Sequence, residues 1–300
     1  MNLQNGTGIL TPVKKFKRIL LCFLLCASGV CAQTLNVASW NIRFLNSADS
    51  AQGNIWSHRA PVIAQIVLFH DFDLWGAQEV FKTQLQTLLS DLPEYSYIGV
   101  GRDDGKEKGE FTPIFYKKER FSLLQSGHFW LSQADSVPGV GWDADCARIC
   151  TWGQFRESLT GNIFWMFNLH LDHKGKIARE KGAELTLQKI KAMCGNAPVI
   201  LTGDFNSSQE GVAYALMNGS QVLRSAYDIA GVKFVLDGTF NDFDVNRHTE
   251  DRIDHIFVSP HFAALRYGVL TDSYWDGGKR RVPSDHYPVQ CVLKFQEIKQ

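Results

Sequence analysis

The chain has 300 residues, 45% of them hydrophobic, with 31 basic and 31 acidic side chains. These values are ordinary for a globular protein with a full core. No linker rich in Pro, Gly or Ser and no internal repeat interrupts the chain. Its motifs extend from residue 40 to residue 286, so we expect one domain assembled from both ends of the sequence.

The first 32 residues have the pattern of a secretory signal peptide. Four basic residues lie between positions 14 and 18, before an apolar stretch over residues 19–30. That stretch is shorter than the roughly 20 residues that a membrane-spanning helix needs. We expect cleavage near Ala32, which leaves residues 33–300 as a catalytic domain in the periplasm or secreted from the cell.

Removal of this segment changes the charge of the protein. It takes away four basic residues and no acidic one, so 27 Lys and Arg remain against 31 Asp and Glu, a net charge of −4. Tight binding to long duplex nucleic acid usually depends on a basic face. The balance of charge therefore counts against a dedicated DNA-binding role.

The predicted elements alternate between strands and helices. In chain order we expect a strand at residues 35–39, a helix capped by Ser57, a strand at 73–77, a helix near 85–92, strands at 111–116, 149–155 and 162–171, a helix at 176–193, and strands at 199–202, 253–258 and 289–295. Several strands follow one another without room for a crossover helix. This favours largely antiparallel pairing, with helices on the outer faces of the sheets.

Four cysteines remain after residue 32, at positions 146, 150, 194 and 291. In an exported protein they predict one or two disulfides, although the sequence leaves their pairing open. Cys146 and Cys150 have the spacing of half a zinc site. No second Cys or His pair lies at the matching distance, so we do not expect zinc.

Polar clusters lie where the predicted strands end or begin. Trp40-Asn41, Gln78-Glu79, the segment Asn168 to Asp172, and Gly203-Asp204-Phe205-Asn206 each close an apolar run, whereas Arg252 to His255 and Ser284-Asp285-His286 each open one. Residues at strand ends converge on one rim of a domain. Carboxylates, amides and histidines gathered there suit a hard divalent cation and a phosphate.

Taken together, these strings are similar to those of a known family. Trp-Asn-Ile-Arg, Gln-Glu-Val, Asn-Leu-His-Leu-Asp, Gly-Asp-Phe-Asn, Arg-Ile-Asp-His-Ile-Phe and Ser-Asp-His-Tyr-Pro-Val occur in the order found in the endonuclease/exonuclease/phosphatase superfamily. The resemblance covers residues 35–295. Segments 101–106, 129–132 and 146–152 look like its secreted bacterial branch.

The resemblance implies an α/β fold with two packed, mixed and largely antiparallel β-sheets flanked by helices, a four-layer α-β-β-α sandwich. It also implies a phosphoesterase that depends on Mg²⁺, with Mn²⁺ able to substitute. Glu79 would be the principal metal ligand, because Mg²⁺ prefers hard oxygen donors. Asp285 would face the metal, and Asn41 would support the metal or donate to the phosphate.

The same resemblance implies the catalytic residues. Asp204 would accept the proton of the attacking water and Asn206 would direct that water or a phosphate oxygen, with both side chains on one side of an extended segment. His286 would bond the scissile phosphate or abstract the proton of the water, and Asp254 would orient its ring.

A second group is implied around His170, which would be the other histidine that contacts the phosphate. Glu110 would be its orienting partner, by analogy with nuclease members. Arg148 would clamp the phosphate with its planar fork. Asp172 would support this group, or would only bond the neighbouring backbone or Lys174.

The substrate class stays open between several phosphate esters. Arg43 stands where base-excision members carry an aspartate, so specificity for abasic sites is not supported. Three basic clusters beside the catalytic strings suggest an anionic substrate larger than free phosphate, and several aromatic residues could stack on a base, a sugar or a lipid head. The clusters are Arg102, Lys106 and Lys108; Lys174, Lys176 and Arg179; and Lys279, Arg280 and Arg281, and the aromatic residues are Trp142, Trp152, Tyr274 and Trp275.

We therefore expect a secreted, Mg²⁺-dependent phosphodiesterase or phosphatase that acts on a small or lipid-linked phosphate ester. A nuclease of broad specificity is the alternative. A catalytically silent protein that binds phosphate or carbohydrate would have lost at least one of the main catalytic residues. All are present: Glu79, Asp204, Asn206, Asp254 and His286. We expect a monomer with no protein partner, and the number of metal ions stays open.

Overall fold

The computed structural model describes residues 1–2 and 34–296. Contacts divide the chain into one unit of residues 1–31 and a second of residues 32–300, and the fold below is that of the second unit. The expected signal peptide lies outside the described residues, except for its first two. Within the described part, no helix combines the length and the apolar character needed to cross a membrane.

Six helices lie in the described part of the chain. They are α1 (Ser47–Ala51), α2 (Trp56–Phe69), α3 (Lys82–Asp91), α4 (Lys176–Cys194), α5 (Val212–Asn218) and α6 (Ala226–Ile229). The predicted helix at residues 176–193 agrees with α4 to within one residue.

The strands of the described residues form two large sheets and a separate hairpin. The seven-stranded sheet has the order β10 (Val232–Phe234), β12 (Phe262–Val269), β15 (Val289–Phe295), β1 (Thr34–Asn41), β2 (Leu74–Gln78), β4 (Ile114–Lys117) and β3 (Tyr95–Ile98). The six-stranded sheet has the order β5 (Phe121–Trp130), β6 (Ile149–Glu157), β7 (Ile163–His170), β8 (Val199–Asp204), β11 (Asp254–Val258) and β9 (Arg224–Ser225). The hairpin pairs β13 (Tyr274–Asp276) with β14 (Lys279–Arg281).

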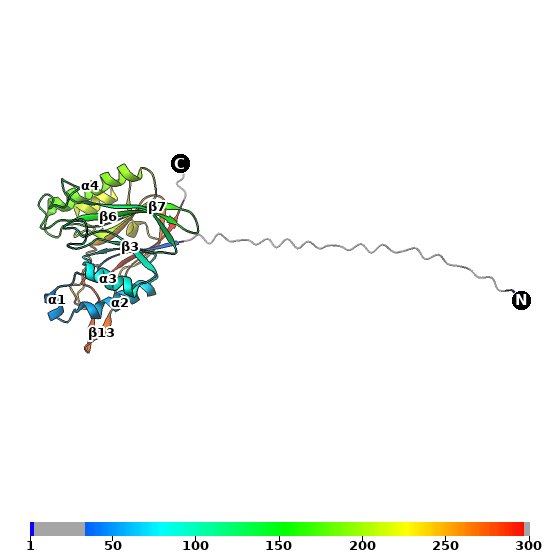
Figure 1. Cartoon of the computed structure of the whole chain (residues 1–300), viewed down its shortest axis with the longest axis horizontal. Helices are drawn as coiled ribbons and strands as arrows, with labels where there is room; N and C mark the ends of the chain where they lie inside the picture. The colour runs from blue at the N-terminus through cyan, green and yellow to red at the C-terminus, as the bar shows by residue number, and fades with distance from the viewer. Residues whose placement is uncertain (3–33, 297–300) are drawn as a thin grey trace. The chain divides into compact units, whose positions relative to one another are not determined.

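The two large sheets stack face to face and helices cover their outer faces, as Figure 1 shows. One apolar core lies between the sheets and includes Val37, Phe155 and Ile256. A second core joins the seven-stranded sheet to α2 and α3, and a third joins the six-stranded sheet to α4 and α5. Most strand pairs are antiparallel, with β1·β2, β7·β8 and β10·β12 parallel. The predicted four-layer sandwich is confirmed.

Alternation along the strands explains how the site is built into this core. In β8, Ile200 belongs to the core between the sheets, whereas Leu201 packs on the outer side with α4 and α5. Because side chains two residues apart share a face, Thr202 and Asp204 lie on the same inner face as Ile200. The inner face of the strand therefore changes from apolar to polar as it approaches the end that carries the site.

A buried polar bridge joins the two sheets just behind that end. Asn168 of β7 donates through Nδ2 to the backbone oxygens of Ala77 (2.7 Å) and Pro113 (2.9 Å). Its Oδ1 accepts from Gln78 Nε2 (2.7 Å) and from Thr202 Oγ1 (3.0 Å). All of these groups are fully buried, so the bridge fixes the backbone that leads into Glu79.

Two expectations from the sequence are wrong. Ser57 does not cap a helix: α2 begins one residue earlier, at Trp56, because that indole packs into the core under the sheet. The four described cysteines are free thiols. Cys291 lies between the sheets, Cys150 and Cys194 lie in the core beneath α4, and Cys146 lies beside Asp172, so no disulfide forms.

Candidate active site

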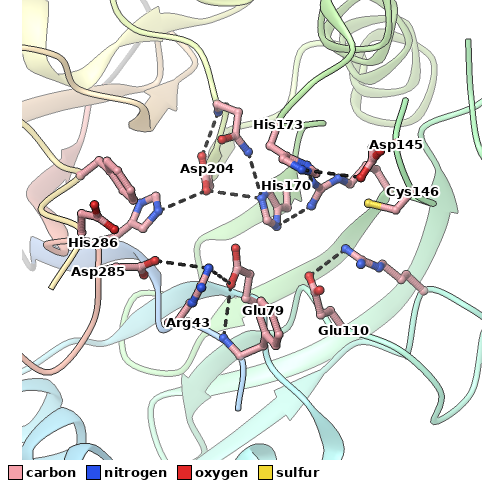
Figure 2. Close-up of a pocket in the computed structure, with 16 residues that line it drawn as sticks. Arg43, Glu79, Glu110, Asp145, Cys146, His170, His173, Asp204, Asp285 and His286 are labelled. Atoms are coloured by element: carbon pink, nitrogen blue, oxygen red, sulfur yellow. Dashed lines mark hydrogen bonds and ion pairs between the residues drawn. The ribbon is translucent and has the colours of Figure 1, made fainter. Parts of the chain in front are cut away.

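The polar strand ends meet in one cavity of about 450 Å³, shown in Figure 2. Asn41 ends β1 and Glu79 directly follows β2, its parallel neighbour, and His170 and Asp204 end the parallel pair β7 and β8. The antiparallel strand β11 begins opposite Asp204, and the segment before β15 lies against β1. The predicted convergence at one rim is therefore present in the structure.

Glu79 and Asp285 lie on one side of the cavity. Asn41 donates through Nδ2 to Glu79 Oε1 (3.0 Å) and to Asp204 Oδ2 (2.9 Å), and its Oδ1 accepts from the backbone of Arg43 (3.0 Å). Glu79 has a left-handed φ of 60°, a strained conformation that proteins keep mostly at functional sites. In this arrangement Asn41 positions two carboxylates, and its role at a metal or phosphate stays a prediction.

A positive charge already lies between these carboxylates. Nη1 of Arg43 is 3.9 Å from Glu79 Oε2 and 3.5 Å from Asp285 Oδ2, and Nε bonds Asp49 Oδ2 (2.8 Å). Burial, together with Glu79, raises the pKa of Asp285 to about 6. The two oxygen donors thus face a position that attracts a cation, which fits a hard divalent ion such as Mg²⁺.

Asp204 lies at the centre of the site and is almost fully buried. Its Oδ1 accepts from the backbone of Asn206 (2.9 Å), and its Oδ2 faces both histidines, 3.4 Å from His170 Nε2 and 3.9 Å from His286 Nε2. Burial, and next the Asp254 carboxylate, raise the pKa of Asp204 to about 7. A carboxylate with that pKa is suited to accept a proton near neutral pH.

His286 is held as an imidazolium. Burial opposes its charge, but Asp254 and Asp204 outweigh that effect and raise the pKa of His286 well above its ordinary value. Nδ1 of the ring bonds Asp254 Oδ2 at 2.8 Å, the pairing expected from the sequence. The backbone oxygen of His286 accepts from the indole of Trp40 (3.0 Å), so both the ring and the main chain are fixed.

His170 is held neutral although it is equally buried. Burial, and next the positive charge of Arg148, lower its pKa well below the ordinary value. Arg148 Nη1 lies 3.0 Å from Nδ1 of the ring, and because a guanidinium can only donate, Nδ1 is the acceptor. The proton of the neutral ring is therefore on Nε2, which faces Asp204 Oδ2 at 3.4 Å. The amide nitrogen of Asn206 also lies 3.1 Å from Nε2, and it donates its hydrogen bond to Leu171 O instead.

Arg148 and Asp172 support His170 from behind. Arg148 also bonds Asp172 Oδ2 through Nε (3.3 Å) and His173 Nδ1 through Nη2 (2.9 Å), so its whole fork is engaged. Asp172 accepts from the backbone of Lys174 (3.0 Å) and of Gly175 (2.7 Å), the backbone bonding that the sequence left as an alternative. The expected phosphate clamp by Arg148 stays a prediction.

Glu110 does not contact His170 as expected. Its Oε2 accepts from Arg102 Nη1 at 2.7 Å, while the ring nitrogen that it was expected to orient faces Arg148. The reason is electrostatic: the charge of a nearby guanidinium stabilises a buried carboxylate more than a hydrogen bond from a neutral imidazole does. Burial, and next Glu79, raise the pKa of Glu110 to about 7.

Asn206 lies where it was predicted, but in a different backbone conformation. It has a left-handed φ of 45° in the turn after β8, whereas the spacing from Asp204 suggested an extended segment. Its Nδ2 donates to Leu171 O (3.0 Å) and lies 3.1 Å from His170 Nε2. The turn still brings Asn206 into the cavity.

Several residues of the cavity were not predicted as site residues. Arg43 and His173 lie next to predicted residues within the same strings, so adjacency was the available signal. Phe240 packs against the His286 ring at 5.1 Å between centroids, and nothing in its own sequence context indicated this. Arg102 was noticed only as part of a charged cluster.

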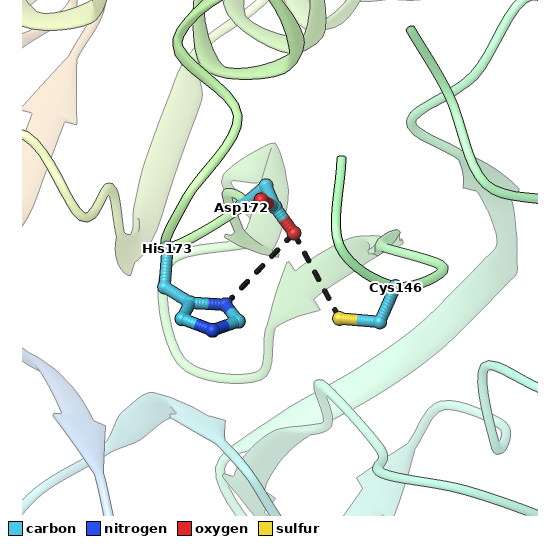
Figure 3. A group of neighbouring side chains, drawn as sticks. All are labelled: Cys146, Asp172 and His173. Atoms are coloured by element: carbon cyan, nitrogen blue, oxygen red, sulfur yellow. Dashed lines mark hydrogen bonds and ion pairs between the residues drawn. The ribbon is translucent and has the colours of Figure 1, made fainter. Parts of the chain in front are cut away.

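A second group of side chains with metal-binding chemistry lies at the edge of the cavity, shown in Figure 3. Cys146, Asp172 and His173 offer ligand atoms within 4.8 Å of one another. Arg148 already bonds both Asp172 and His173, and burial raises the pKa of Cys146, which keeps it a thiol. Because its thiol is protonated and its other two members are already hydrogen-bonded to Arg148, this group does not suit a cation.

Comparison with known proteins agrees with this geometry. A solved endonuclease/exonuclease/phosphatase family protein from Bacteroides thetaiotaomicron is 50% identical, with a TM-score of 0.87 over 88% of this chain and 99% of that one. The mannosyl-6-phosphatase of Bacteroides thetaiotaomicron is also 50% identical, with a TM-score of 0.85 over 87% of this chain and 100% of that one. Protein L388 of Acanthamoeba polyphaga mimivirus is 26% identical over 259 residues, 80% of this chain and 92% of that protein.

The match to a family model covers nearly all of the described sandwich. Residues 38–286 match the Endonuclease/Exonuclease/phosphatase family, and they include every residue of the cavity from Arg43 to His286. The chain belongs to the endonuclease/exonuclease/phosphatase family.

Proposed function

We propose that this protein is a Mg²⁺-dependent phosphatase that hydrolyses a sugar phosphate of the mannose 6-phosphate class. Members of its family are phosphoesterases and nucleases that use divalent metals. The observation that carries the proposal is the central carboxylate, Asp204, placed between a protonated histidine and a neutral one. This arrangement supplies a base for water and donors for a phosphate within one buried site.

The residues divide the work of hydrolysis. Asp204 takes one proton from water as the water oxygen bonds to phosphorus and the bond from phosphorus to the sugar oxygen breaks. The sugar oxygen takes up a proton from water, which gives the free sugar and inorganic phosphate. His286 and His170 donate through Nε2 to phosphate oxygens, and the imidazolium state of His286 favours this role over abstraction of a proton.

Glu79 and Asp285 are the residues that would hold the metal. When bound there, Mg²⁺ supplies Lewis-acid stabilisation of the charge that develops on the phosphate and the leaving oxygen. The strained backbone of Glu79 and the hydrogen bond from Asn41 fix the carboxylate before the ion arrives. Such preorganisation lowers the cost of assembling the site.

A small sugar phosphate fits the cavity and the comparisons better than a nucleic acid does. The cavity of about 450 Å³ is of the size that proteins use for small ligands. Identity of 50% to a mannosyl-6-phosphatase over nearly the whole chain supports a related substrate. The net charge of −4 for residues 33–300 gives little attraction to a long polyanion.

The proposed location follows from the sequence of the first 32 residues. We infer export to the periplasm or beyond, with the mature chain beginning at Gln33. Mass spectrometry of the protein recovered from the exporting cell measures this directly. A retained amino terminus or an attached lipid would contradict the inference.

One panel of assays tests the proposed activity. Release of inorganic phosphate from mannose 6-phosphate and glucose 6-phosphate is compared with cleavage of bis-p-nitrophenyl phosphate, RNA and plasmid DNA, with Mg²⁺ or with EDTA. We expect sugar phosphates to be the best substrates and EDTA to abolish turnover. Faster cleavage of DNA or RNA would favour the nuclease alternative, and full activity in EDTA would contradict the metal.

A matched pair of variants ties the metal to its ligand. Glu79→Gln keeps the shape of the side chain but removes its charge, so Mg²⁺ binding measured by calorimetry should weaken together with turnover. Asp91→Asn makes the same kind of change at an exposed carboxylate at the end of α3, and it should change neither Mg²⁺ binding nor turnover. Unchanged Mg²⁺ affinity in Glu79→Gln would show that the ion binds elsewhere.

A further inference from the structure

A solvent-exposed hairpin carries a basic cluster and an aromatic residue that the catalytic cavity does not use. β13 and β14 form a small sheet of their own, and Figure 1 shows this hairpin projecting from the body of the domain. Its turn consists of Gly277 and Gly278, with φ of 55° and 75°. Trp275 is 75% exposed on the first strand. Single exposed apolar side chains are common on protein surfaces, so the significance of this indole depends on the groups beside it.

The pairing of the strands defines two faces of the hairpin. Tyr274 lies opposite Arg281, and Trp275 lies opposite Arg280. Because alternate residues point to opposite faces, Trp275 and Arg280 share one face while Tyr274 and Arg281 share the other. Arg280 is exposed, so the indole has one cationic group beside it, whereas the exposed Lys279 lies on the other face with Arg281.

The other face of the hairpin is fastened to the segment that follows α1. Arg281 Nη1 bonds the backbone oxygen of Gln52 (3.3 Å) and Oδ1 of Asn54 (3.1 Å), just after α1. Within α1, Asp49 holds Arg43 of the cavity. Four residues after Arg281 the chain reaches Asp285, so the hairpin is connected to the cavity wall through contacts and through sequence.

A second anchor keeps the hairpin from moving freely. His58 Nδ1 of α2 lies 2.9 Å from Asp276 Oδ2, and Arg281 Nε lies 3.6 Å from the same oxygen. The indole is therefore presented on a hairpin fixed to α2 and to the segment after α1, which lowers the conformational entropy lost when a ligand binds.

The chemistry of the exposed face favours a glycan over a membrane. The tip consists of Asp276, Gly277, Gly278 and Lys279, so insertion into a bilayer would bury an acid and bare backbone for the sake of one apolar ring. A flat indole instead packs well on the apolar C–H face of a sugar ring. The adjacent guanidinium of Arg280 matches the charge of phosphate groups carried on the same glycan chain.

We propose that Trp275 and Arg280 form an accessory binding surface for the phosphorylated glycan from which the cavity removes phosphate. The proposal rests on the proposed function, because it takes the substrate to be a sugar phosphate. The indole packs against a sugar unit outside the cavity, and the guanidinium of Arg280 pairs with a phosphate along the glycan chain. This surface raises the affinity for a polymer and has no contact with a single sugar phosphate in the cavity.

The test compares a small substrate with a large one. For Trp275→Ala, KM for phosphate release from a phosphorylated mannan should rise about tenfold, which corresponds to about 1.4 kcal/mol, while kcat and KM for mannose 6-phosphate stay unchanged. Trp275→Phe keeps a ring and should recover most of the affinity. Arg280→Ser should raise KM for the phosphorylated mannan and leave binding to the dephosphorylated mannan unchanged.

Phe234→Ala is the matched control, because Phe234 is an exposed aromatic residue, 59% accessible, on β10 at the edge of the seven-stranded sheet. Its kcat and KM should match those of the wild type for both the phosphorylated mannan and mannose 6-phosphate. Equal kinetics of Trp275→Ala and wild type on the phosphorylated mannan would overturn the proposal. Equal losses on mannan and on mannose 6-phosphate would overturn it too, because the hairpin would then act on the cavity itself.

Direct binding separates this proposal from the proposed function. Calorimetry with the phosphorylated mannan should show weaker binding by Trp275→Ala, whether or not the wild type hydrolyses it. If the wild type binds the mannan through Trp275 but releases no phosphate, the proposed activity is wrong and the surface stands. If Trp275→Ala loses co-sedimentation with anionic phosphatidylglycerol vesicles and keeps mannan binding, the surface is a membrane contact and the proposal is wrong.

Discussion

His286 and His170 lie on either side of Asp204, and they differ in charge although they are equally buried. Both rings are about 5% exposed or less, and both direct Nε2 towards Asp204 Oδ2. Asp254 stands behind His286 and Arg148 stands behind His170, so the pKa of the first is raised and that of the second is lowered. Burial alone would lower the pKa of both. The group behind each ring therefore decides its protonation.

The difference gives one site two kinds of phosphate contact. An imidazolium supplies a full positive charge, and a neutral imidazole supplies one fixed donor without adding charge. Asp204 would lose its ability to accept a proton if both rings were imidazolium, because two cations would depress its pKa. The asymmetry keeps the central carboxylate useful as a base.

The largest effect is expected from the carboxylate that both rings share. Asp204→Asn removes the base and should lower kcat by about 10²–10⁴-fold, the usual size for general base catalysis. It also removes one of the charges that raise the pKa of His286, so that pKa should fall. Steady-state kinetics and NMR titration of His286 measure the two effects, and a variant with near wild-type kcat would remove Asp204 from this role.

The acidic limb of the pH profile provides a second check on Asp204. The carboxylate accepts a proton only when ionised, so kcat/KM should fall as pH decreases through its pKa. That midpoint should lie at or below about 7, because a bound cation favours the ionised form. An activity that rises as pH falls from 7 to 5 would contradict the assignment.

The next largest effect tests the charged side of the comparison. Asp254→Asn removes the group that holds His286 as an imidazolium, and His286→Ala removes the ring, so each should lower kcat/KM by about 10²-fold or more. Because both act through one ring, the double variant should be little worse than the worse single one. Losses that multiply would show that the two residues act independently.

A smaller effect is expected on the neutral side. Arg148→Met removes the positive charge beside His170, so the pKa of that ring should rise towards its ordinary value, and kcat/KM should fall by about tenfold, more at low pH than at high pH. Arg156→Met, an exposed position on β6, serves as the control. An unchanged His170 pKa in Arg148→Met would show that burial alone keeps the ring neutral.

The smallest effect concerns Glu110. Since it pairs with Arg102 instead of His170, Glu110→Gln should cost no more than about tenfold in kcat/KM, the scale of one hydrogen bond. It should also leave the tautomer of His170 unchanged in NMR spectra. A change of tautomer would show that Glu110 does orient the His170 ring, as expected from the sequence.

The sequence predicted the site better where a residue lies on a strand than where it lies on a loop. Asp204 and Asp254 are strand residues whose face follows from alternation, and their register places them opposite each other. Glu110 lies at the end of a loop that folds through left-handed glycines at 105 and 109. Its direction depends on that loop, which the local pattern does not specify, so its partner was wrongly predicted.

The protonation states also could not be predicted from the sequence. The family resemblance implied the pairing of Asp254 with His286, because both belong to strings typical of the family. Arg148 directly precedes β6 and His170 ends the neighbouring strand β7, and only the register of these strands brings the guanidinium to the ring. Without knowledge of that contact, the sequence does not indicate which ring nitrogen of His170 accepts a hydrogen bond.

The most direct test of the account is the protonation of the two rings in one protein. ¹⁵N NMR of selectively labelled histidines, assigned with His170→Gln and His286→Gln, reports the charge and tautomer of each ring. At pH 7, without metal, we predict His286 protonated on both nitrogens and His170 protonated on Nε2 alone. If both rings are neutral, or if their pKa values agree within about one unit, then the opposed environments do not control the site and the account is wrong.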